Sequence, residues 1–178
     1  MASRELKDLV PELRKKANQV VEICKKNNVD ILIYCTLRTL EDQAKLFRQG
    51  RSRVAINKKI EELNSKGYNF LSDIIKKVGP QNETKIVTNA APGFSWHNYR
   101  KAFDAVPIVG GKAMWSNSHP SWIVYGDACL EVGLTWAGTW KTFKEYPHAQ
   151  LDPGNPITSS TNPEDIKKYF IEHNLLMV

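Results

Sequence analysis

The ten residues SWHNYRKAFD, at positions 95–104, place a histidine and an aspartate seven residues apart. An imidazole and a carboxylate are both common zinc ligands in proteins. His97 and Asp104 could therefore form half of a metal site. The same residues also fit a turn that leads into a strand, because small and apolar residues flank the aspartate. Both interpretations stay open until other parts of the chain are considered.

A second pair with the chemistry of a metal site stands in the segment WAGTWKTFKEYPHAQ, residues 136–150, where Glu145 comes three residues before His148. A carboxylate beside a bound metal can act as a general base that takes a proton from the attacking water and passes it to the leaving amine. Neither pair is specific alone, because a histidine near aromatic residues is more often a packed, hydrogen-bonded residue. The stronger zinc signature His-Glu-x-x-His does not occur in the sequence.

Together the two pairs resemble the motifs of the M15 peptidases, zinc enzymes that cut peptidoglycan peptides and include D-Ala-D-Ala dipeptidases, DD-carboxypeptidases and phage L-alanyl-D-glutamate endopeptidases. SWHNYRKAFD resembles the family motif Ser-x-His-x-x-Gly-x-Ala-x-Asp, and Glu145 with His148 resembles its acidic-x-x-His motif. The resemblance implies a Zn²⁺ ion, one per chain, held by His97, Asp104 and His148. It also implies that Glu145 is the catalytic base.

A third segment, CTLRTLEDQAKLFRQGRS at residues 35–52, resembles the Arg-Thr/Ser-x-x-x-Gln-x-x-Leu-aromatic-x-x-Gly-Arg segment of the endopeptidase branch. The resemblance implies that Arg38 binds or polarises the substrate near the metal. Gln43 is a further candidate for substrate binding, with a position on a helix surface as the favoured alternative. Ser95 either hydrogen-bonds the substrate or shapes a turn.

The chain departs from the family pattern at two positions. Arg100 stands where the family motif has Gly, so the turn before the strand must be built without the residue that most easily adopts a positive φ. Glu145 stands where the endopeptidase branch commonly has Asp, and the longer carboxylate can keep the same role. The aromatic residues Trp136 and Trp140 are expected to form walls of the cleft.

The elements around these motifs predict an α+β fold: a single domain of residues 1–178, with a small antiparallel sheet flanked by helices, as in DD-peptidases and Hedgehog-type domains. Residues 54–85 are expected to be a helical insertion, and residues 151–178 a loop and a helix. The expected helices are 6–27, 40–48, two within 54–79, 121–132 and 162–176, and the expected strands are 29–37, 85–90, 101–109 and 148–151. A turn at Gly110-Gly111 is expected to start a hairpin.

The composition is that of a soluble globular protein, with 178 residues, 42% apolar and 25% charged. No apolar run approaches the roughly 20 residues that span a bilayer. The N-terminus is charged from its fourth residue and does not resemble a secretory signal peptide. We therefore expect the protein to stay in the cytoplasm until it is released to the cell wall. The cysteines Cys24, Cys35 and Cys129 are expected to be buried thiols.

The net charge of +6 suits a polyanionic partner such as an anionic cell wall. Nucleic acid is not an expected partner, because the chain has no recognisable binding motif for it. We expect a monomer that acts on bacterial peptidoglycan and does not associate stably with membranes.

The favoured function is that of a zinc metallopeptidase which hydrolyses the L-Ala–D-Glu bond of peptidoglycan stem peptides as a phage or prophage endolysin. One alternative is a D-Ala-D-Ala carboxypeptidase or dipeptidase. A second alternative is a zinc-bearing binding module without catalytic activity, against which the presence of Glu145 and Arg38 argues.

Overall fold

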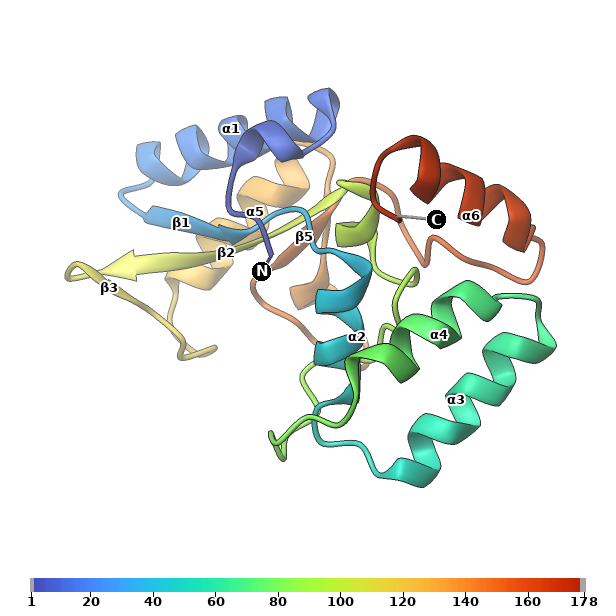
Figure 1. Ribbon diagram of the computed structural model, residues 1–178. Helices are drawn as coiled ribbons and strands as arrows, with labels where there is room; N and C mark the ends of the chain where they lie inside the picture. Colours follow the sequence, from blue (N-terminus) through green and yellow to red (C-terminus); the bar gives the residue numbers. More distant parts are fainter. Residues whose placement is uncertain (1, 177–178) are drawn as a thin grey trace. The chain divides into compact units, whose positions relative to one another are not determined.

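The computed structural model describes residues 2–176 (Figure 1). Its internal contacts divide the chain into two compact units. The sheet unit consists of Ala2–Leu37 and Tyr99–Gly154, and the helical unit consists of residues 38–98 and 155–176. The single domain of residues 1–178, and the assignment of residues 54–85 as an insertion, stay predictions.

An antiparallel sheet forms the centre of the sheet unit. Its strands are β1 (Asp30–Cys35), β2 (Ala102–Val109), β3 (Lys112–Ala113), β4 (Thr135–Trp136) and β5 (His148–Gln150). The strand order is β1-β2-β5-β4, and β3 pairs with β2 through the predicted hairpin at Gly110-Gly111. Strand β2 lies between β1 and β5, and its residues from Ala102 to Pro107 are buried. This strand therefore carries Asp104 through the interior of the sheet unit.

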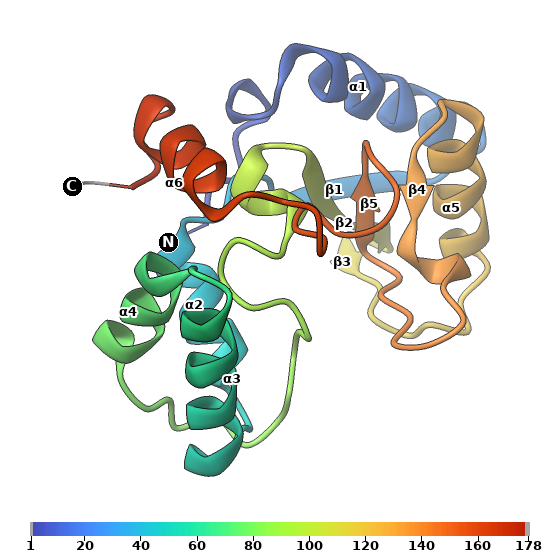
Figure 2. The ribbon, with the colours of Figure 1, turned by 90° about the vertical axis from the view of Figure 1, so that its right-hand side faces the viewer.

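Two helices, α1 (Pro11–Lys26) and α5 (Ser121–Glu131), pack together against the sheet (Figures 1 and 2). Helix α1 begins at Pro11, where the missing N–H of proline costs nothing. Its buried residues Leu13, Ala17, Val20 and Cys24 recur at helical spacing and face the core. The predicted α+β class with a small antiparallel sheet and flanking helices is confirmed.

Trp136 belongs to this core, and the expectation that it forms a wall of a cleft is wrong. Its ring is buried and lies so close to Gly126 of α5 and to Gly138 that a Cβ atom at either glycine would overlap it. The two glycines thus provide the room that the indole needs. Trp136 contributes to the site through its ring nitrogen, as described below.

Arg100, which stands where the family motif has Gly, adopts a positive φ in the structure. Its φ is 63°, in the left-handed region that costs a non-glycine residue about 1–2 kcal/mol. The Arg100 guanidinium offsets this cost, because its Nε donates to the carbonyl oxygen of Asp8 at 2.6 Å. The Arg100 carbonyl in turn accepts from the Val10 N–H at 3.0 Å, which ties the turn to the start of α1.

We expect Arg100→Ala to lower the free energy of unfolding by about 1.5–3 kcal/mol, because alanine keeps the unfavourable φ and loses the charge-assisted hydrogen bond to Asp8. Arg100→Gly loses the same bond but removes the steric cost of the positive φ, so it should be the more stable of the two variants. Denaturant unfolding followed by circular dichroism measures both. An alanine variant as stable as the glycine variant would show that the turn carries no such strain.

The helical unit contains α2 (Leu40–Arg48), α3 (Arg53–Ser65), α4 (Asn69–Val78) and α6 (Pro163–Glu172). Side-chain caps explain where three of them begin: Thr39 accepts from the Asp42 N–H, Ser52 from the Ala55 N–H, and Asn162 from the Glu164 N–H. Helices α3 and α4 are separated near Lys66-Gly67, as the sequence predicts.

The predicted strand at residues 85–90 is wrong, because these residues, all of them described, pair with no other strand. They form an irregular segment with bends at residues 85 and 89, and side-chain donors bind its carbonyls in place of a strand ladder. Arg51 donates to the Thr88 carbonyl at 2.7 Å, and Ile86 and Val87 are about half exposed. Ile86 and Val87 are apolar residues of the kind found in strands, but their side chains are not buried as those of a stable strand would be.

No helix within residues 2–176 is long and apolar enough to cross a membrane. All three cysteines are buried and unoxidised, as expected.

Candidate functional site

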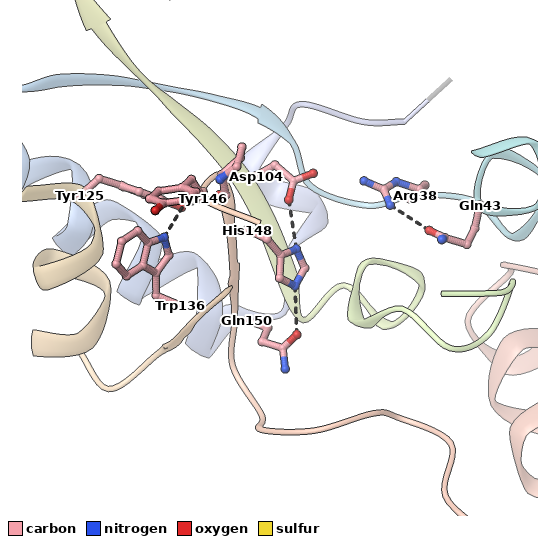
Figure 3. A network of polar contacts seen from close by, with 9 residues as sticks. Arg38, Gln43, Asp104, Tyr125, Trp136, Tyr146, His148 and Gln150 are labelled. Atoms are coloured by element: carbon pink, nitrogen blue, oxygen red, sulfur yellow. Dashed lines mark hydrogen bonds and ion pairs between the residues drawn. The ribbon is translucent and has the colours of Figure 1, made fainter. Parts of the chain in front are cut away.

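Asp104 and His148 face each other across neighbouring strands of the sheet unit. They are direct partners in the antiparallel pairing of β2 with β5, so their side chains point to the same face of the sheet. The distance from His148 Nδ1 to Asp104 Oδ1 is 3.1 Å, and both residues are less than a tenth exposed. Figure 3 shows the imidazole of His148 between Asp104 and Gln150. The sheet unit therefore brings together the two predicted metal ligands that it contains.

The spacing of these two atoms fits a shared metal ion. Ligands that lie about 2.0–2.2 Å from a tetrahedral zinc are about 3.3 Å apart, close to the 3.1 Å observed. Cys35 lies opposite Asp104 on β1, and its Sγ is within 4.8 Å of a carboxylate oxygen of Asp104. Imidazole, carboxylate and thiolate are all donors that zinc accepts, so the donor set of this face fits the metal that the sequence predicts.

The electrostatics of His148 also favour a cation at this position. Burial by itself lowers the pKa of the imidazole. The hydrogen bond and charge of Asp104 outweigh burial, with help from the charge of Glu145 and from Gln150, so the pKa of His148 is raised above its ordinary value. The surroundings of this ring therefore stabilise positive charge, which a proton or a metal ion can supply.

Backbone anchors position the Glu-x-x-His segment. Trp136 Nε1 donates to the Tyr146 carbonyl at 2.7 Å, and the Tyr125 hydroxyl donates to the Pro147 carbonyl at 2.8 Å. Burial raises the pKa of Tyr125 well above its ordinary value, so its phenol stays a donor. These bonds fix the residues immediately before His148. The aromatic residues of the region thus act mainly by placing the backbone.

Glu145 is half-buried, and its backbone is tied on both sides. Its N–H donates to the Ala137 carbonyl at 3.3 Å, and its carbonyl accepts from the His148 N–H at 3.1 Å. Its carboxylate is close enough for its charge to raise the pKa of His148. Trp140 is also half-buried, and its ring centroid lies 5.8 Å from that of His148. The carboxylate and the imidazole of the second motif are therefore neighbours in space as well as in sequence.

The helical unit holds Arg38 and Gln43 as a hydrogen-bonded pair (Figure 3). One Arg38 Nη donates to Gln43 Oε1 at 2.8 Å, and Gln43 Nε2 donates to the Ala90 carbonyl at 2.7 Å. Gln43 is fully buried, so the helix-surface alternative for it is wrong. Its amide oxygen accepts from one edge of the planar Arg38 guanidinium and so helps to orient that group.

His97 and Ser95 lie in the same unit as Arg38, and both are buried. The His97 carbonyl accepts from the Arg38 N–H at 3.3 Å. Asn98 links the two segments: its Nδ2 donates to the Arg38 carbonyl at 2.8 Å and its Oδ1 accepts from the Gly93 N–H at 3.0 Å. The predicted site residues thus divide into Arg38, Gln43, Ser95 and His97 in the helical unit and Asp104, Glu145 and His148 in the sheet unit.

Sequence reasoning missed three residues that the geometry connects to the site: Tyr125, Asn98 and Gln150. Gln150 had a usable signal, because a residue two positions after His148 on a strand points to the same face. Asn98 directly follows His97, and apart from its small polar side chain nothing in the sequence indicated that it contacts the site. Tyr125 lies on the buried face of a helix 23 positions before His148, and its contact depends on the tertiary packing.

Comparison with known proteins finds similarity to peptidoglycan peptidases. Residues 88–151, which contain both motifs, match the model of an M15 peptidase family described as D-alanyl-D-alanine carboxypeptidase. The peptidoglycan L-alanyl-D-glutamate endopeptidase CwlK of Bacillus subtilis (strain 168) is 27% identical over 154 residues, which cover 82% of this chain and 75% of that protein. The crystal structure of the L-Ala D-Glu endopeptidase ChiX of Serratia marcescens aligns with a TM-score of 0.44 and 19% identity, over 85% of this chain and 89% of that one. These matches in sequence cover the segment that carries the histidines and carboxylates of the candidate site, and they show that the chain is similar to M15 peptidases.

Proposed function

We propose that this protein is a zinc-dependent peptidase that hydrolyses the L-Ala–D-Glu bond in the stem peptides of bacterial peptidoglycan. The Asp104–His148 pair carries the proposal, because it lies in the segment that matches the peptidase family and its spacing fits a shared zinc ion. The name of the Bacillus subtilis relative supports the choice of bond.

In this proposal His97, Asp104 and His148 hold the zinc. When bound, zinc supplies a Lewis acid that polarises the scissile carbonyl and lowers the pKa of water beside it. Glu145 takes the proton from the attacking water as the new C–O bond forms. The same proton then passes to the nitrogen of the leaving D-glutamyl residue as the C–N bond breaks. The backbone bonds at Ala137 and His148 hold Glu145 for this role.

Arg38 is the proposed substrate contact. A guanidinium stays charged at physiological pH and can bind a substrate carboxylate or the developing oxyanion through two parallel N–H donors. Gln43 and Ser95 are secondary candidates for the same function. The buried Arg38–Gln43 hydrogen bond supports a positioning role for Gln43, because it limits the rotation of the guanidinium.

We expect Arg38→Ala to lower kcat/KM for stem peptides by about 10- to 100-fold, the size of a lost hydrogen bond to a charged group, and to leave the zinc content unchanged. Arg53→Ala, at an exposed position at the start of α3, is the matched control and should have the wild-type kcat/KM. Steady-state kinetics and metal analysis of both variants give the answer. Loss of zinc or of the fold in Arg38→Ala would exclude the role of substrate contact.

Incubation with defined stem peptides, with and without a chelator, tests the proposed function most directly. Mass spectrometry of the products distinguishes the bond that is cut. Chelator-sensitive cleavage between L-Ala and D-Glu is the expected result. Bound zinc without cleavage of any stem peptide would make the non-catalytic binding module the better account.

A second function is favoured by the description of the matching family model, D-alanyl-D-alanine carboxypeptidase. An enzyme of this kind would remove a single terminal D-alanine, which the same mass spectra would show. The two functions need the same metal and base and differ only in how the substrate is placed. The contacts of Arg38 would then be made to the C-terminal carboxylate of the peptide.

We also propose that the protein acts as a phage or prophage endolysin on the wall of its host. The net charge of +6 supports contact with an anionic wall. Cells that express the protein should lyse when their membrane is permeabilised, and cells that express Glu145→Gln should not. Equal lysis by the two proteins would contradict this role.

A further inference from the structure

Gln150 completes a row of three polar side chains on one face of the sheet unit, next to His148 and Asp104 (Figure 3). We propose that Gln150 is a positioning residue that holds His148 with a proton on Nε2 and thereby presents Nδ1 as the atom that binds the metal. This inference rests on the proposed function, in which His148 is a zinc ligand.

The orientation of the Gln150 amide follows from its neighbours. One end of the amide lies 2.7 Å from the Asp152 carbonyl oxygen and 3.2 Å from the Gly154 carbonyl oxygen. Carbonyl oxygens only accept hydrogen bonds, so this end must be the NH₂ group, which has two protons to donate. The other end, Oε1, lies 2.9 Å from His148 Nε2. Reversal of the amide would lose both bonds to the Asp152 and Gly154 carbonyl oxygens.

The tautomer of His148 follows from the orientation of Gln150. Oε1 of a glutamine can only accept, so His148 Nε2 must carry the proton and donate it. A neutral imidazole has one proton, which leaves the lone pair on Nδ1. That lone pair points to the carboxylate oxygen of Asp104 at 3.1 Å, which is an acceptor as well when the group is ionised. Two acceptors at this distance need a cation between them, which is a proton on Nδ1 in the metal-free protein and a zinc ion in the proposed holoenzyme.

The segment around Gln150 is held in place by strand pairing and by an ion pair. Its side chain is 3% exposed, and its backbone pairs with Ala102 on β2 and Thr135 on β4. Asp152 forms an ion pair with Lys101, with Nζ 2.8 Å from Oδ2. The carbonyls that hold the Gln150 amide therefore lie in a segment that is fixed to the neighbouring strand. Partners of this kind set the ring orientation of metal-bound histidines and raise their basicity.

Nuclear magnetic resonance of the wild-type protein tests the inference without any variant. The probe is ¹¹³Cd²⁺ in place of zinc, in protein with ¹⁵N-labelled histidine. We expect a cadmium coupling to Nδ1 of His148 and a directly bonded proton on Nε2. Coupling to Nε2 would overturn the inference, and so would the absence of any coupling to His148.

This experiment separates the two proposals. A protein that cleaves stem peptides but shows cadmium bound to His148 Nε2 keeps its proposed function and refutes the role of Gln150. A protein with cadmium on Nδ1 and no cleavage of stem peptides keeps the role of Gln150 and refutes the peptidase.

Gln150→Leu removes the acceptor and retains a side chain of similar size. We expect a zinc dissociation constant that is about 10- to 100-fold higher than that of the wild type, the usual effect of losing such a partner. Gln19→Leu, on the exposed side of α1, is the matched control and should bind zinc like the wild type. Competition with a chromophoric chelator measures both constants, and thermal unfolding checks that both variants fold. A folded Gln150→Leu protein with unchanged zinc affinity would overturn the inference.

Discussion

We expect Glu145→Gln to lower kcat for stem-peptide cleavage by about 10²- to 10⁴-fold and to leave the zinc content unchanged, because glutamine has the size of glutamate but cannot accept the proton of the attacking water. The backbone bonds of this residue, to the Ala137 carbonyl and from the His148 N–H, do not depend on its side chain. The variant should therefore fold and bind metal normally. Single-turnover kinetics with a defined stem peptide, beside metal analysis, measure both quantities.

The matched control for this variant is Glu131→Gln, at the exposed end of α5. It makes the same chemical change in the same unit and should have the wild-type rate. If Glu145→Gln also cleaves at the wild-type rate, Glu145 has no part in proton transfer. A Glu145→Gln protein without zinc would mean that the carboxylate is a ligand instead of a base.

The second large effect is expected for His148→Ala, which should abolish detectable cleavage. It should also weaken zinc binding by more than the 10- to 100-fold that is typical when a residue that hydrogen-bonds a metal ligand is lost. The variant removes one of the three proposed ligands. It also removes the imidazole that lies 3.1 Å from the buried Asp104 carboxylate. Metal analysis after dialysis, and the rate of cleavage with added zinc, measure the two effects.

His173→Ala is the control for His148→Ala. His173 is exposed at the end of α6, where its ring stacks on Tyr169, and it matches no motif. Its loss should change neither zinc content nor rate. A His148→Ala protein that retains full zinc content would exclude His148 as a ligand. The contact between Asp104 and His148 would then have no role in metal binding.

Several elements could be predicted residue by residue because their signals are local. Helix α2 runs from Leu40 to Arg48 as predicted, since Thr39 caps its first turn. Other bounds were only approximate: the predicted helix 6–27 is α1 (Pro11–Lys26) after a short 3-10 turn at Leu6–Asp8, and the predicted helix 162–176 is α6, which Asn162 caps and which ends at Glu172. By contrast, residues 85–90 have the composition of a strand and still form none, because a strand needs a partner and the sequence of one segment does not show whether a partner is present.

The sequence by itself predicted candidate metal ligands and a candidate base, because the motifs that resemble those of the family are visible in the order of the residues. Only the tertiary structure decided how Asp104 meets His148, since the two are 44 positions apart and face each other only through the register of β2 and β5. A shift of one residue in that register would turn one of them to the opposite face of the sheet. The same packing decided the burial of Trp136 and the contact of Gln150 with His148, because both depend on which surfaces lie together after folding.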